Sequence, residues 1–107
     1  MRTDHVSGQM DLLLLSALAR GPAHGYAVIS RLHQSSNGFF DLPEGAVYPA
    51  LHRLERDGLL ASRWDESGER RRRVYEVTPA GLGALAARKH QWQLFARGMQ
   101  TVVRGTA

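Results

Sequence analysis

Residues 44–60, which read EGAVYPALHRLERDGLL, decide the fold of this chain. Apolar residues recur there at spacings of three and four, which predicts a short helix over residues 44–57 with one buried face. The buried positions are Val47, Ala50, Leu51 and Leu54. Pro43 suits the start of a helix, and Gly58 is typical of the position just past its end. Pro49 lies opposite the apolar face, where we expect it to bend the helix without breaking it.

The elements on either side complete a recognisable order. Apolar helices are predicted over residues 9–20, after a frayed segment 1–8, and over residues 24–35. Strands are predicted over residues 59–64 and 72–77, with a turn between them, and a long helix over 79–103. Three helices followed by a strand, a basic turn and a strand are typical of a winged helix-turn-helix. The sequence thus predicts a mainly α fold with a small β-hairpin: a winged helix-turn-helix DNA-binding domain at residues 1–77 and a C-terminal dimerisation helix at 78–107.

Composition narrows the class of protein. The chain has 107 residues, 43% of them hydrophobic, with a net charge of +4 and no cysteine, so disulfides and thiolate metal sites are excluded. The histidines show no paired metal spacing, and no nucleophile elbow or glycine-rich phosphate loop occurs. The longest apolar run, residues 12–15, is far too short to span a bilayer. We therefore expect a cytoplasmic protein that is not an enzyme, with no cofactor, no metal and no membrane partner.

The face of the 44–57 helix opposite its apolar residues could touch DNA. Its tyrosine can donate to a phosphate oxygen, its arginines can reach phosphates or guanine edges, and its glycine permits close approach. The alternative is an ordinary solvated helix face. The proposed DNA-contacting residues are Gly45, Tyr48, Pro49, His52, Arg53 and Arg56.

Four consecutive arginines, Arg70, Arg71, Arg72 and Arg73, follow the turn between the two strands. Alternate residues of a strand point to opposite faces, so two of the four can meet one phosphate backbone, and a wing arginine can also enter the minor groove. The alternative is a solubilising run, partly neutralised by the acidic residues of the turn. Their position at the tip of a wing favours nucleic acid.

The last helix carries an apolar stripe close to a heptad pattern. A helix of this length outreaches a domain of this size, so we expect pairing with a second copy, although packing back on the same domain would also cover the stripe. The predicted dimerisation residues are Leu82, Leu85, Trp92, Phe95, Met99 and Val102. Trp92 is expected in the core of that interface, and also at an effector site if the dimer encloses a cavity.

Four motifs make the chain similar to the PadR family of bacterial transcriptional regulators over about residues 9–88. They are residues 12–18 (LLLLSAL), 21–26 (GPAHGY), 45–60 and 73–81 (RVYEVTPAG). The Tyr48-Pro49 pair is a feature of the family. Ala46-Val47 departs from its usual Thr-Leu or Ser-Leu, which removes a hydroxyl that could touch phosphate.

The resemblance implies that residues 24–36 and 44–57 form the helix-turn-helix, 65–73 the wing, and the last helix the dimerisation element of the short PadR subfamily. Some short members sense planar aromatic compounds between the two protomers through tryptophans on this helix, which Trp92 matches loosely. The sequence hypothesis is a homodimeric repressor that binds double-stranded DNA at a pseudo-palindromic operator and is released by a small aromatic effector. The alternative is a winged-helix protein-interaction module without specific DNA binding.

Overall fold

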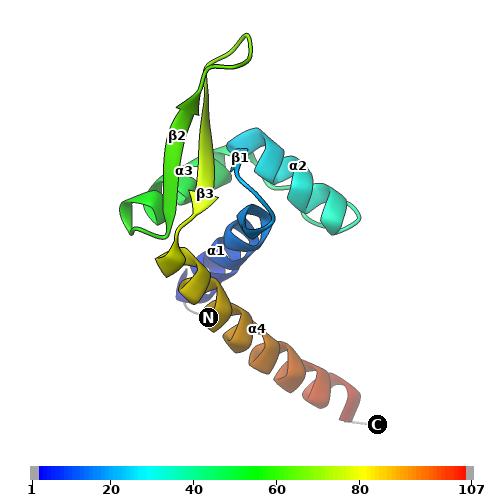
Figure 1. Ribbon diagram of the computed structural model, residues 1–107. Coiled ribbons are helices and arrows are strands. Elements are labelled where there is room, and N and C mark those ends of the chain that lie inside the picture. The colour runs from blue at the N-terminus through cyan, green and yellow to red at the C-terminus, as the bar shows by residue number, and fades with distance from the viewer. Residues whose placement is uncertain (1–2, 106–107) are drawn as a thin grey trace.

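The computed structural model describes the backbone of residues 3–105 and the side chains of residues 8–105. Three helices precede a hairpin, and a long helix follows it (Figure 1). The elements are α1 (Thr3–Ala19), β1 (Ala23–His24), α2 (Gly25–Ser35), α3 (Glu44–Arg56), β2 (Leu60–Asp65), β3 (Arg72–Val77) and α4 (Pro79–Gly105). The expected mainly α winged helix-turn-helix is confirmed. The expected fraying of residues 1–8 is wrong from Thr3, where α1 begins, and residues 1–2 lie outside the described part.

One hydrophobic core holds α1, α2, α3 and the base of the hairpin together. Apolar faces of the three helices meet there, as their spacing predicts, and Tyr75 of β3 closes the core from the sheet side. The largest fully buried side chains are Leu14, Leu15, Val28, Val47, Leu51, Leu54, Leu60 and Tyr75. All four residues predicted for the buried face of α3 are in this core, which fixes the direction of the opposite face.

The sheet has three antiparallel strands in the order β1-β3-β2. The hairpin of β2 and β3 pairs Leu60 with Val77 at its base and Asp65 with Arg72 near its tip. The third strand, β1, was not predicted, because two residues are too few to show alternation. It pairs Ala23 with Tyr75 and His24 with Val74, so it ties the start of α2 to the wing.

The junction between the hairpin and α4 is tightly built. Thr78 caps α4, because its Oγ1 accepts a hydrogen bond from the Gly81 N–H at 3.0 Å and donates to the Gly58 carbonyl at 2.7 Å. Gly81 packs so closely on the Leu59 carbonyl that a Cβ would collide with backbone. These contacts fix the angle at which α4 leaves the domain.

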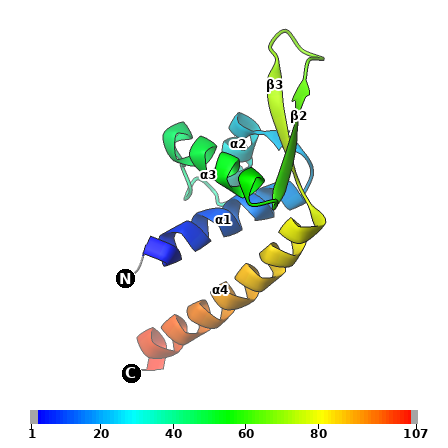
Figure 2. The ribbon, with the colours of Figure 1, turned by 90° about the vertical axis from the view of Figure 1, so that its left-hand side faces the viewer.

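Beyond its first turns α4 projects from the domain, and α1 and α4 diverge from the base of the hairpin (Figures 1 and 2). The molecule is consequently elongated, at 57 × 28 × 23 Å. None of the helices within residues 3–105 is long and apolar enough to cross a membrane.

Candidate nucleic-acid interface

The exposed face of α3 consists of residues that point away from the core. Gly45, Pro49, His52 and Arg56 are all exposed, while Tyr48 lies at the border and is half-buried. Pro49 is accommodated inside the helix on this outer side. The face is free of bulky apolar residues and combines a cation with an imidazole ring.

Tyr48 is positioned by contact with α2. A Cβ placed on Gly25 would lie 2.6 Å from Cε1 of Tyr48 and 2.9 Å from its hydroxyl, so only glycine lets the two helices approach this closely. The close approach holds the Tyr48 ring between the start of α2 and the outer face of α3. This contact sets the angle between the two helices of the helix-turn-helix.

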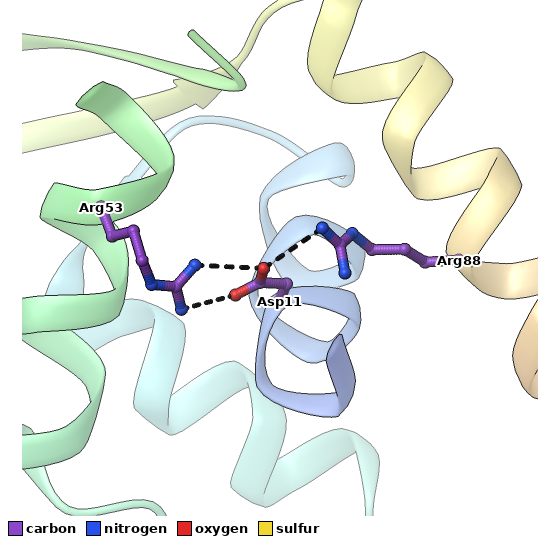
Figure 3. Close-up of polar contacts among 3 residues, drawn as sticks. All are labelled: Asp11, Arg53 and Arg88. Carbon is purple, nitrogen blue, oxygen red and sulfur yellow. Dashed lines mark hydrogen bonds and ion pairs between the residues drawn. The ribbon is translucent and has the colours of Figure 1, made fainter. Parts of the chain in front are cut away.

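Arg53 differs in placement from the other residues predicted on this face. Its guanidinium turns toward α1, where Nη2 donates to Oδ1 of Asp11 at 2.8 Å and Nη1 donates to Oδ2 at 3.1 Å (Figure 3). Arg88 of α4 approaches the same carboxylate at 3.5 Å. The Asp11 side chain is 4% exposed, and its hydrogen bond raises the pKa of Arg53. Arg53 therefore joins α3 to α1 and does not lie on the outer face.

Two signals in the sequence could have indicated this contact. Arg53 adjoins Leu54 and lies three residues after Ala50, which puts it at the border of the buried stripe of a helix with 3.6 residues per turn. Asp11 immediately precedes the leucine run at residues 12–15, in the helix predicted over residues 9–20. A buried carboxylate requires a partner, and an arginine supplies the best-matched one.

The wing arginines are ordered by neighbouring groups. Trp64 of β2 lies opposite Arg73 in the sheet, and the guanidinium carbons of Arg71 and Arg73 lie 4.2 and 5.1 Å from the centre of its ring. Arg71 also pairs with Glu66 at 3.0 Å, and Arg73 pairs with Glu55 at 3.4 Å. These partners hold the two arginines on the Trp64 side of the hairpin.

Arg72 points the other way, as alternation along β3 predicts, and its Nη1 lies 2.8 Å from Nε2 of His24. His24 also caps α2, because its Nδ1 accepts a hydrogen bond from the Ala27 N–H at 3.3 Å. Neither the role of Trp64 nor the contact between His24 and Arg72 was predicted from the sequence.

A groove of about 570 Å³ separates the wing from the helix-turn-helix. The four wing arginines line it together with Tyr48 and His52 of α3 and His24 of β1, and one acidic residue, Glu44, also lies on its wall. The structure thus brings Tyr48, His52, Arg70, Arg71, Arg72 and Arg73 to one concave surface. Gly45, Pro49 and Arg56 lie on the adjoining outer face of α3, and Arg53 lies apart from both.

Known proteins resemble this chain in sequence and in fold. The model of the "Transcriptional regulator PadR-like family" matches residues 14–87. This chain belongs to the PadR-like family. The transcriptional regulator Rv3488 of Mycobacterium tuberculosis is 41% identical over 86 residues, which cover 80% of this chain and 78% of that protein. The named relatives are transcriptional regulators and not enzymes.

Solved structures agree with the family. A transcriptional regulator from Clostridium thermocellum superposes with a TM-score of 0.82 at 27% identity, covering 94% of this chain and 96% of the other. A PadR family transcriptional regulator from Eggerthella lenta gives a TM-score of 0.79 at 35% identity, covering 90% and 82% of the two chains. The likeness extends over α4 as well as the winged helix.

In this PadR-family chain, α4 leaves large apolar side chains exposed. Trp92, Phe95 and Met99 are 46%, 43% and 52% exposed, and Leu82 and Val102 are also exposed. Leu85 differs from the rest of the predicted stripe, because it is half-buried against the core of its own domain. Leu94 and Val103, which the heptad pattern does not include, are exposed apolar residues of the same helix.

A second groove, of about 490 Å³, lies between α1 and α4. Leu12 of α1 and Trp92 and Phe95 of α4 supply its apolar surface, and Arg88 adds a cation. The rings of Trp92 and Phe95 are tilted by 30° with their centres 6.1 Å apart. Trp92, the residue that the sequence singled out for an effector, thus lines a groove with one aromatic wall, on α4.

Proposed function

We propose that this PadR-family regulator is a homodimeric repressor that binds double-stranded DNA in the cytoplasm. Residues 1–77 bind DNA in this proposal, and residues 78–107 dimerise. The outer face of α3, with Gly45, Tyr48, Pro49, His52 and Arg56, enters the major groove. The wing arginines contact the flanking phosphates or the minor groove. Arg53 has a different role, which is to hold α3 on α1 through Asp11.

The observation that carries the proposal is the concave surface between wing and helix-turn-helix. Four arginines and two residues of α3 line this surface, beside an exposed helix face with no bulky apolar group. Such a concentration of fixed cations suits the closely spaced phosphates of a duplex. The main acidic partners, Glu55 and Glu66, each lie beside an arginine and hold it in an ordered position in the absence of DNA.

The exposed apolar residues of α4 support the homodimer. Burying Trp92, Phe95, Met99 and Val102 against the same helix of a second copy would remove them from water and give a two-fold axis. Two-fold symmetry implies a pseudo-palindromic operator with half-sites about 10 bp apart, or a multiple of that spacing.

The groove at Trp92 supports an effector as a second part of the proposal. Its aromatic wall on α4 suits a planar aromatic compound, and Trp92 and Phe95 on that wall also belong to the predicted dimerisation residues. A ligand there regulates DNA binding only if its affinity differs between DNA-competent and DNA-incompetent dimers. Quenching of Trp92 fluorescence by planar aromatic compounds, absent in Trp92→Phe, would support it, since Trp64 contributes equally to both proteins.

A salt titration of DNA binding tests the main proposal. The duplex upstream of the gene that encodes this chain is compared with a random duplex of equal length. We expect tighter, salt-sensitive binding to the former, at two protomers per site. Equal, weak binding to both duplexes would contradict specific regulation by the chain alone and favour the protein-interaction module.

A further inference from the structure

His24 contacts two hydrogen-bond donors through its two ring nitrogens. Its Nδ1 faces the Ala27 N–H at 3.3 Å, and its Nε2 faces Nη1 of Arg72 at 2.8 Å. A neutral imidazole has one acceptor nitrogen, and a guanidinium has only donors. His24 can therefore accept from the backbone of α2 or from Arg72, but not from both.

The hydrogen bond from the Ala27 N–H is favoured over the contact with Arg72 as the use of the single acceptor nitrogen of His24. The Ala27 N–H belongs to the first turn of α2, where the helix supplies no acceptor, whereas the exposed Arg72 can bond to water. With Nδ1 as the acceptor, the ring proton is on Nε2. In that tautomer the Nε2–H of His24 and the guanidinium of Arg72 are two adjacent donors without a shared acceptor.

The backbone keeps the two side chains together. His24 pairs with Val74 across β1 and β3, and Arg72 lies two residues before Val74 on the same face of β3. Neither residue can leave this side of the sheet without a change of register. The fold thus keeps the two side chains on one side of the sheet, within reach of each other.

The surroundings select the kind of acceptor that fits. Both residues line the groove between the wing and the helix-turn-helix, together with Tyr48 and the other wing arginines. Burial, then the nearby charge of Arg72, lowers the pKa of His24; Arg31 also lowers it, and Asp65 opposes the shift. An anion with several oxygens could accept from both residues, and the duplex proposed for the adjoining face of α3 carries such anions along its backbone.

We infer that His24 and Arg72 bind one backbone phosphate of DNA, with the Nε2–H of His24 and the guanidinium of Arg72 each donating to its oxygens. This inference rests on the proposed DNA binding and adds His24 to its contacts. The phosphate replaces a contact between two donors by two charge-assisted hydrogen bonds, while Nδ1 continues to cap α2. It also links the wing to the start of α2.

The first test separates capping from phosphate binding. His24→Asn keeps an oxygen that can cap α2, because asparagine is a preferred cap residue, but removes the Nε2–H donor. Binding to a random duplex and to the gene's own upstream duplex is measured over a range of salt concentrations. His33→Asn, the same change at the exposed far end of α2, is the matched control.

We expect His24→Asn to weaken binding to both duplexes about tenfold, with an unchanged salt slope, because a neutral imidazole releases no counterion. Arg72→Gln weakens binding and also lowers the salt slope by about one. In the double variant we expect a loss of affinity smaller than the product of the two single losses, because both residues contact one phosphate. Wild-type affinity in His24→Asn, or strictly multiplicative effects, would overturn the inference.

The second test follows the His24 ring by nitrogen NMR. On addition of duplex we expect a single Nε2–H tautomer and a rise in the pKa of His24, since the phosphate stabilises the imidazolium. His33 should show neither change. An unaltered tautomer and pKa in the complex would contradict the phosphate contact.

The two proposals fail separately. A wild-type protein without preference for its upstream duplex, combined with weaker binding of His24→Asn to both duplexes, would leave the phosphate contact and remove specific regulation. A clear operator preference with no effect of His24→Asn would leave the regulator and remove the phosphate contact.

Discussion

Asp11 on α1 receives two hydrogen bonds from Arg53 on α3, across 42 residues of sequence. The carboxylate is buried, whereas the side chains of Arg53 and Arg88 are each 34% exposed. This difference in exposure matters, because an arginine that loses its partner here can be solvated by water, whereas the Asp11 carboxylate cannot. The contact joins α3, the helix proposed to bind in the major groove, to α1, and Arg88 extends it to α4.

Removal of Arg53 should therefore destabilise the protein more than neutralisation of Asp11. We expect Arg53→Ala to lower the free energy of unfolding by about 2–3 kcal/mol, because it leaves a buried carboxylate with only the more distant Arg88. Asp11→Asn should cost about 1 kcal/mol, since the amide oxygen can still accept from an arginine. Urea denaturation measures both.

Arg56→Ala is the control, because Arg56 is exposed on the same helix and should change stability by less than about 0.5 kcal/mol. Equal costs for Arg53→Ala and Arg56→Ala would show that the contact with Asp11 contributes nothing.

Two glycines of α4 should respond to alanine with opposite signs. A Cβ at Gly81 would collide with the Leu59 carbonyl, so we expect Gly81→Ala to destabilise the protein by about 1–3 kcal/mol. Among the described residues, no atom outside the adjoining backbone of α4 lies within 4 Å of a Cβ at Gly83. Gly83→Ala should stabilise the protein by about 0.5–1 kcal/mol through helix propensity. Thermal unfolding of the pair checks both signs, and stabilisation by Gly81→Ala would refute the close approach.

Local signals made most of the fold predictable. Pro43 and Gly58 indicated the limits of α3 to within a residue, and alternation indicated β3 with its observed bounds. The short strand β1 has no comparable signal, because it exists only through pairing with β3. The start of α1 at Thr3 was also missed, because the helix was predicted only where apolar residues recur.

The candidate site was less predictable than the fold, because its side chains meet across the chain. Periodicity indicated the outer face of α3. Arg53 was assigned to that face because arginines often contact DNA, although its position in the helix borders the buried stripe. The contact of His24 with Arg72 joins residues 48 apart in sequence and depends on the register of β1 with β3. The border position of Arg53 and the placement of Asp11 before the leucine run indicate that each needs a partner, but no single segment of sequence shows which residues meet in either contact.

The exposed apolar face of α4 predicts a dimer, and a charge introduced on this face should disrupt it. In Met99→Glu we expect a shift from dimer to monomer in sedimentation experiments, because burying an unpaired carboxylate in an apolar interface is unfavourable. Gln100→Glu adds the same charge at a neighbouring exposed position that is not part of the predicted stripe, and it should remain dimeric. A wild-type protein that is monomeric at micromolar concentration would contradict the proposed dimer.

The wing should contribute affinity without sequence preference. Arg71 is held by Glu66 and Trp64 at the groove, in reach of a backbone phosphate in the proposed complex. Arg71→Gln should weaken binding to the upstream and the random duplex by a similar factor and lower the salt slope by about one, since one fewer counterion is released. Arg104→Gln, the same change near the far end of α4, is the control. Loss of affinity for the upstream duplex alone would instead assign Arg71 to base recognition, and an unchanged salt slope would remove the wing from the DNA-binding surface.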